Sequence, residues 1–133
     1  MRKIMAALAL STLVLGGAPA IAKEKKTGDE KLAELLEGRV AGTPESCIST
    51  SRSDNLRVID NTAIVYDAGD TIWVNTTRNP KDLDWTDALV IERLSSQRLC
   101  RLDQVTTIDR SSGFFTGVVF LEDFVPYKKV DAS

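Results

Sequence analysis

The sequence has 133 residues, of which 43% are hydrophobic and 27% charged, and its formal net charge is −2. Its basic residues are spread along the chain, so neither nucleic acid nor an anionic membrane is expected as the main partner. No histidine is present, which excludes Ser-His-Asp and Cys-His catalysis and zinc sites built from imidazole. Phosphate-binding glycine loops and nucleophile motifs are also missing, and we predict no catalytic residue, no metal ligand and no cofactor.

The first 22 residues have the three parts of a secretory signal. Residues 1–3 are a basic start, residues 4–15 are almost entirely apolar, and residues 20–22 form an Ala-x-Ala cleavage site. The apolar run of about 12 residues is shorter than the roughly 20 that span a bilayer. We predict cleavage between Ala22 and Lys23. The product is expected in the periplasm, with an extracellular location as the alternative, and without a membrane span.

Removal of this leader leaves about 110 residues, enough for one domain but not for two. We predict a disordered polar start over residues 23–28, a single β-rich domain with an N-terminal helix over residues 29–128, and a tail over residues 129–133. Because Arg2 and Lys3 leave with the leader, the product is more acidic than the whole chain.

The first predicted element after the leader is a short helix. Thr27 suits its N-cap, and Glu30, three residues later, completes a capping box. Gly38 suits the left-handed backbone that ends many helices. Three leucines at helical spacing share one face: Leu32, Leu35 and Leu36. We expect this face to pack on the domain, with a partner-binding helix as the alternative.

Beyond this helix the pattern changes to β-rich runs joined by short turns. The predicted strands are residues 56–59, 63–66, 71–76, 88–94, 99–109 and 114–124. Asp60-Asn61 and residues 67–70 form the turns between the first three strands, since Asp, Asn and Gly tolerate the backbone that tight turns need. The run at 85–94 also fits a helix, and we favour the strand. Pro126 is expected to end the last strand.

Five to seven short strands predict a mainly β fold. We expect a small antiparallel barrel or sandwich, with the short N-terminal helix plugging one end or covering one face. We expect the aromatic side chains to be buried or half-buried in the core, with a ligand-stacking platform as the alternative. These aromatic residues are Tyr66, Trp73, Phe114, Phe115, Phe120 and Phe124.

Cys47 and Cys100 are the two cysteines of the chain. An isolated pair in an oxidising compartment usually forms one disulfide. Such a bond would close a loop of about 54 residues, which the chain-entropy treatment values at roughly 4 kcal/mol. Two free buried thiols are the alternative.

The densest acidic segment contains Asp82, Asp84 and Asp87. Carboxylates are oxygen ligands for calcium, but their spacing misses the helix–loop–helix calcium pattern. We therefore expect a solvated loop that caps the next element. Asn75-Thr76-Thr77 matches a glycosylation acceptor, and we interpret the match as chance because the leader is of bacterial type.

Several short motifs occur together in this chain. They are Cys47-Ile48, Val58-Ile59-Asp60, Arg98-Leu99-Cys100 with Asp103, and Leu121-x-x-Phe124-x-Pro126. This pattern resembles a family of small exported proteobacterial proteins that is itself a domain of unknown function. The resemblance covers most of residues 45–128 and implies export, a β-rich fold and the Cys47–Cys100 bridge, but no activity. The chain departs from the family at Leu102, where glycine is common, and at Pro80 and Val119, near which a further cysteine pair is common.

Together these features predict a non-enzymatic exported domain that binds an unknown protein or an envelope component. One alternative is a secreted inhibitor of a cell-wall hydrolase, because rigid, disulfide-tied loops lose little freedom on binding. Another is a carboxylate-dependent hydrolase, which needs two acidic residues in one cleft.

Overall fold

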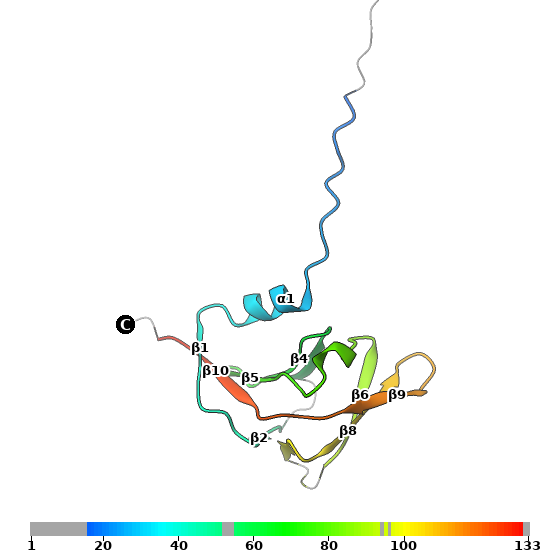
Figure 1. Cartoon of the computed structure of the whole chain (residues 1–133). Helices are drawn as coiled ribbons and strands as arrows, with labels where there is room; N and C mark the ends of the chain where they lie inside the picture. Colours follow the sequence, from blue (N-terminus) through cyan, green and yellow to red (C-terminus); the bar gives the residue numbers. More distant parts are fainter. Residues whose placement is uncertain (1–15, 52–54, 94, 96, 132–133) are drawn as a thin grey trace, which may run out of the picture.

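In this computed structural model the chain is described over residues 16–51, 55–93, 95 and 97–131. The basic start and apolar run of the predicted leader, residues 1–15, lie outside the described residues. The described part forms one α-helix, one short 3-10 helix and ten strands (Figure 1). Within it, no helix has the length and the apolar character needed to cross a bilayer.

The largest sheet has five antiparallel strands in the order β1-β10-β5-β4-β3. Its strands are β1 Arg39–Ala41, β3 Leu56–Ile59, β4 Ala63–Asp67, β5 Thr71–Asn75 and β10 Val125–Lys129. The predicted meander β3-β4-β5 is confirmed. Both of its turns contain the expected positive φ, at 53° for Asn61 and 89° for Gly69.

Two smaller antiparallel sheets pack on one face of the large sheet. One pairs β2 Cys47–Ser49 with β7 Arg98–Cys100, and the other has the order β6-β8-β9. The strands of the second are β6 Asp87–Glu92, β8 Gln104–Asp109 and β9 Phe115–Val119. Within the ambiguous run at 85–94, Asp87–Glu92 therefore form a strand, as favoured, and residue 94 lies outside the described residues. The described sheets remain separate, so the mainly β fold is sandwich-like and not a closed barrel.

Strand β4 is buried on both faces. Ile64 and Tyr66 face the smaller sheets and join one apolar cluster, whereas Ala63 and Val65 join a second cluster on the opposite face. A strand covered on both sides needs a continuous apolar run rather than an alternating one. The sequence Ala-Ile-Val-Tyr at the start of β4 meets this need.

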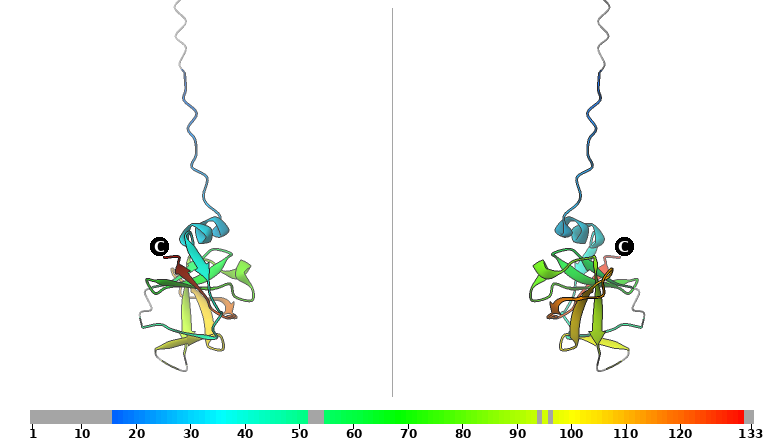
Figure 2. Two further views of the ribbon diagram at one scale, coloured as in Figure 1. Left: turned by 90° about the vertical axis from the view of Figure 1, so that its left-hand side faces the viewer. Right: turned by 90° about the vertical axis from the view of Figure 1, so that its right-hand side faces the viewer.

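Helix α1, Gly28–Leu35, covers the second cluster. The predicted capping box is present, with the Thr27 side chain accepting from the Glu30 backbone and the Glu30 side chain accepting from Thr27. Leu32, Leu35 and Leu36 pack against the cluster, as predicted. Figures 1 and 2 show the helix above the large sheet, with the N-terminal segment leading away from the domain. The molecule thus has three layers: the helix, the large sheet and the two smaller sheets.

The predicted disulfide is confirmed. Cys47 and Cys100 are directly opposite each other in the β2–β7 pair, with 4.0 Å between their Cα atoms, and they are bonded through sulfur. The bond ties together segments that are 53 positions apart in the sequence.

The prediction of one strand over residues 99–109 is wrong, because a tight turn divides it into β7 and β8. The carboxylate of Asp103 accepts a hydrogen bond from the Cys100 backbone N–H at 2.7 Å, and the Asp103 N–H donates to the Cys100 carbonyl at 3.0 Å. Local Asp-to-backbone bonds compete with strand pairing in this way.

The prediction that one strand runs from 114 to 124 and ends at Pro126 is also wrong. Strand β9 stops at Val119, and Pro126 lies inside β10, opposite Trp73 of β5. On its other side, the Pro126 carbonyl accepts from the Gly42 N–H at 2.7 Å, just beyond the end of β1. A side chain on Gly42 would meet the proline ring at 3.0 Å. Proline has no N–H to donate. It is tolerated at position 126 because a donor there would point to the place where pairing with β1 ends.

The burial of the aromatic residues was predicted correctly for only three of the six. Phe124 and Tyr66 are buried and Trp73 is half-buried, but three phenylalanines are exposed. Phe114, Phe115 and Phe120 have 75%, 64% and 50% of their surface accessible. The reason is that, in the part of the chain that the structure describes, no further layer covers the outer face of the β6-β8-β9 sheet, on whose edge strand or flanks they lie.

Candidate functional site

The candidate site is organised by a buried amide at the end of β5. Asn75 is fully buried, and its Nδ2 donates to the Glu122 carbonyl at 2.6 Å. Its Oδ1 accepts from the backbone N–H groups of Thr77 and Glu122, each at 3.0 Å. One side chain thus joins the loop after β5 to the segment between β9 and β10. Because this amide has no accessible surface, the glycosylation match at Asn75 is not usable in the folded domain.

Thr77, next in this loop, has a backbone conformation that its residue type disfavours. Its φ is 56°, and a β-branched residue at positive φ carries strain of about 1–3 kcal/mol. Among the described residues, its hydroxyl is the one buried side-chain polar atom with no hydrogen-bond partner. Such strain persists only where surrounding bonds enforce it, and the Asn75 bonds do so here.

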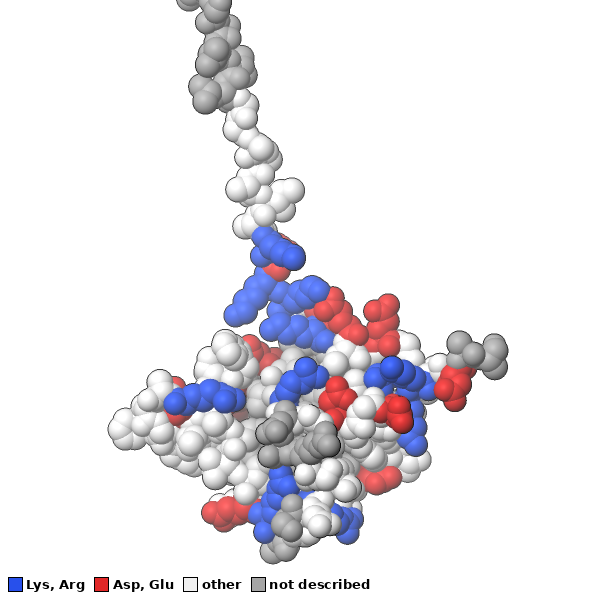
Figure 3. All heavy atoms as spheres, turned by 180° about the vertical axis from the view of Figure 1, so that it is seen from behind, with Lys and Arg blue, Asp and Glu red and all other residues white. Residues whose placement is uncertain are grey.

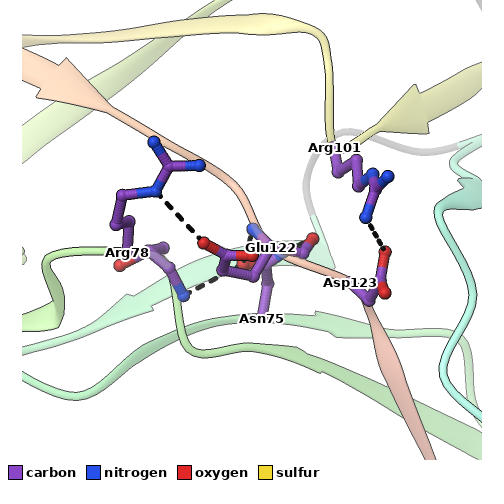
Figure 4. Close-up of polar contacts among 6 residues, drawn as sticks. Asn75, Arg78, Arg101, Glu122 and Asp123 are labelled. Atoms are coloured by element: carbon purple, nitrogen blue, oxygen red, sulfur yellow. Dashed lines mark hydrogen bonds and ion pairs between the residues drawn. The ribbon is translucent and has the colours of Figure 1, made fainter.

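This loop presents Arg78 to the surface. The Arg78 N–H donates to the Phe120 carbonyl at 2.9 Å, and its guanidinium bonds to the Glu122 carboxylate at 3.3 Å. The guanidinium carbon also lies 5.5 Å from the centre of the Phe120 ring. Figure 4 shows Arg78 and Glu122 reaching towards each other above Asn75.

A second ion pair lies on the other side of the same segment. Arg101, in the turn between β7 and β8, approaches Asp123 at 3.2 Å (Figure 4). The hydrogen bond from the Cys100 N–H to the Asp103 carboxylate fixes that turn. Within it, the Leu102 side chain points into solvent, with 83% of its surface exposed. Exposed ion pairs contribute only about 0–1 kcal/mol to stability. The two ion pairs therefore add little to the stability of the fold, and their main effect is on the shape and charge of the surface between them.

A groove with a volume of about 590 Å³ lies beside these ion pairs, and we call it the Arg78–Arg101 groove. Its exposed apolar residues are Leu102, Val118 and Phe120.

The groove continues onto the outer face of the β6-β8-β9 sheet. In the strand register Val90 and Val118 both lie opposite Thr106, and a bulge places Phe115 opposite Ile108. These residues therefore share the face that points away from the buried Val105 and Val119. We name the exposed set Val90, Phe115, Val118 and Phe120 the apolar face. When the molecule is seen from behind, its left-hand end, where the β6-β8-β9 sheet lies, is largely uncharged (Figure 3).

The hairpin that carries Phe115 is braced by Asp109. Its carboxylate accepts from the hydroxyl and N–H groups of Ser111 and Ser112. These bonds, that of the Ser111 hydroxyl foremost, lower the pKa of Asp109 to about 2. The β8–β9 turn is thereby fixed at neutral pH.

The structure brings Asp82 and Asp84 together and places Asp87 elsewhere. Asp87 accepts from the Thr116 hydroxyl. Asp60, Asp82 and Asp84 border one hollow of about 410 Å³. Asp84, however, accepts from the backbone N–H and hydroxyl of Thr86, which hold its pKa below the ordinary value. A glycosidase acid requires the opposite shift.

No group of three or more acidic or cysteine side chains in the described part of the chain is arranged to hold a metal ion. Ala22 and Lys23, the predicted cleavage position, lie in an exposed segment without secondary structure. Cys47 and Cys100 form the disulfide described above.

Of the residues that line the Arg78–Arg101 groove, Phe120 was named from the sequence, as one of the aromatic side chains expected in the core with a ligand-stacking platform as the alternative. Arg78 and Arg101 were not identified, because they are 23 positions apart and match no motif. No family model matches the chain, and no curated protein or solved structure shows a significant match to it. The site therefore has to be interpreted from its own geometry.

Proposed function

We propose that this protein is an exported, non-enzymatic binding domain that docks a protein partner through the apolar face and the adjoining Arg78–Arg101 groove. One observation carries the proposal: three large apolar side chains of this region, Leu102, Phe115 and Phe120, are at least half exposed. Exposed apolar patches larger than roughly a few hundred Å² are rare on soluble monomers and mark interaction sites.

The energetics favour docking by this surface. Transfer of a leucine or phenylalanine side chain from water to an apolar interface contributes about 1.5–3 kcal/mol. The strained, multiply bonded loop at Thr77 holds the groove in one shape, so little freedom is lost on binding. Arg78 and Arg101 stand beside the apolar residues with acidic partners already in place. These charged residues at the rim of the groove favour a partner that carries mixed polar groups around an apolar centre, as is typical of protein interfaces.

Export supports the same proposal. The leader predicted at residues 1–22, an accessible cleavage position at Ala22–Lys23 and the Cys47–Cys100 disulfide are all typical of a periplasmic protein. The proposed membership in the exported proteobacterial family has the same implication. Inhibition of a cell-wall hydrolase is one form that such binding can take.

Site-specific photocrosslinking in the host periplasm tests the proposal. A photoreactive phenylalanine analogue replaces Phe120, and the matched control replaces Val40, which is 58% exposed on β1 of the large sheet. We expect a discrete crosslinked species from position 120, lost when Leu102→Asp is added, and none from position 40. Equal crosslinking from both positions, or none from position 120, would contradict the proposal.

A further inference from the structure

Trp85 is the exposed one of the chain's two tryptophans, with 58% of its surface accessible. It borders the hollow of about 410 Å³ between the β3–β4 turn and the segment that joins β5 to β6, and we call this the Trp85 hollow. A large flat ring beside a polar hollow offers a ligand both an apolar surface and hydrogen bonds. The polar side chains of the lining include Asn61, Lys81, Asp82 and Thr86.

Two hydrogen bonds hold the two sides of this hollow together. The Asn61 N–H donates to the Leu83 carbonyl at 2.9 Å, and the Trp85 N–H donates to the Asp60 carboxylate at 2.7 Å. Leu83 itself is buried in the larger apolar cluster. The hollow is therefore formed before a ligand arrives, and little freedom is lost on binding.

Three side chains of the lining have no partner within the described part of the chain. Those of Asn61, Lys81 and Asp82 make no hydrogen bond or ion pair there. By contrast, the carboxylates of Asp60 and Asp84 already accept from backbone N–H groups. The groups left for a ligand are an amide, an ammonium and a single carboxylate, which together supply both donors and acceptors.

This set of groups favours an uncharged ligand that is rich in hydroxyls. An ammonium ligand attracted to the indole would meet the like charge of Lys81, and an anion would meet that of Asp82. A hydroxyl both donates and accepts, so it bonds with either residue. A pyranose ring with equatorial hydroxyls adds a second match, because its axial C–H groups form an apolar face that packs flat on an indole ring.

The Trp85 hollow adjoins the proposed docking surface. Asp82 also lines a hollow of about 280 Å³ that reaches Val118 and Phe120. Trp85 and Asn61 line neither that hollow nor the Arg78–Arg101 groove. Substitutions at these two residues therefore separate the two surfaces.

We propose that the Trp85 hollow binds a short oligosaccharide of β-1,4-linked gluco-configured pyranose rings. One ring stacks on the Trp85 indole, and its hydroxyls bond to Asn61, Lys81 and Asp82. Soluble glucan fragments and cell-wall glycan both supply such rings, and the glycan adds 2-acetamido groups. This inference does not rest on the docking of a protein partner, which uses other side chains.

NMR titration of the purified protein with cellotriose, tri-N-acetylchitotriose and sorbitol tests the proposal. Sorbitol has the hydroxyls but no ring. We expect one or both oligosaccharides to shift the Trp85 indole N–H and the Asn61 side-chain amide, with half-saturation at or below about 5 mM. The Trp73 indole and the fully buried Asn75 amide should stay in place. The tighter of the two oligosaccharides identifies the source of the ligand. No saturable shift with either one, or equal shifts with sorbitol or spermidine, would overturn the proposal.

Variants locate the site. Trp85→Ala, followed by the Asn61 amide, should weaken binding by at least about tenfold, and Trp85→Phe, which keeps a ring, should weaken it less. Asn61→Gly should weaken binding by about threefold, since it removes the amide while glycine suits the φ of 53° at this position.

The matched control is Phe120→Ala, which removes an exposed ring of the docking surface and should leave saccharide binding within about twofold. Equal effects of Trp85→Ala and Phe120→Ala would reject the Trp85 hollow as the saccharide site. Crosslinking from position 120 reports the protein partner and the titration reports the saccharide, so either proposal can fail without the other.

Discussion

Replacing Asn75 with alanine removes the side chain that joins two loops of the candidate site. Three hydrogen bonds are lost, to the Glu122 carbonyl, the Glu122 N–H and the Thr77 N–H. A hydrogen bond contributes about 1 kcal/mol net, and a buried group left without a partner costs about 1–3 kcal/mol. We therefore expect Asn75→Ala to lower the free energy of unfolding by about 3 kcal/mol, a large share of the 5–15 kcal/mol typical of a domain.

Urea unfolding followed by tryptophan fluorescence measures this loss, since Trp73 and Asn75 lie on the same face of β5. The midpoint should fall with little change in the denaturant slope. In the variant, the backbone amides of Thr77 and Glu122 should also exchange with deuterium faster than amides of β4, because their acceptor is gone.

The matched control is Asn79→Ala. Asn79 is exposed and its side chain caps no helix, so its loss should change stability by no more than about 0.5 kcal/mol. If Asn75→Ala costs less than about 1 kcal/mol, or no more than Asn79→Ala, the bonding role assigned to this amide is refuted.

Three further predictions follow from other parts of the fold. Cys47→Ala combined with Cys100→Ala should lower the free energy of unfolding by roughly 4 kcal/mol, because a loop of about 54 residues is no longer closed in the unfolded chain; an unchanged urea midpoint would contradict this. The Asp109 carboxyl, with its pKa lowered to about 2 by hydrogen bonds from the serine hydroxyls and N–H groups of its turn, should stabilise the β8–β9 turn fully above about pH 4 and lose that effect as the pH falls towards 2; an NMR titration of the Asp109 carboxyl carbon with a midpoint near 4 would show that the bonds are absent. Gly28→Ala places a methyl group 2.0 Å from the Thr62 hydroxyl and should weaken the docking of α1, lowering thermal stability by several degrees; an equal melting temperature would mean that α1 does not rest on this turn.

Elements governed by neighbouring residues were predicted well from the sequence. The capping box at Thr27 and Glu30 needs only residues three positions apart, and the turn at Asn61 needs only one residue that tolerates positive φ. The mainly β fold followed from apolar runs between such turns. The disulfide was also predictable, because Cys47 had a single possible partner in the chain.

The tertiary structure alone decided which apolar side chains are buried and where the candidate sites lie. Phe115 and Phe124 are the same residue type and both lie in the run 114–124 that was predicted as one strand, yet Phe115 is 64% exposed and Phe124 is 1% exposed. The difference arises because one lies on an uncovered sheet face and the other between sheets. In the same way, Arg78 meets Glu122 only because Asn75 joins their loops across 47 residues of sequence. Local patterns specify backbone conformation, but burial and long-range polar contacts depend on how the sheets are layered, which no short segment encodes.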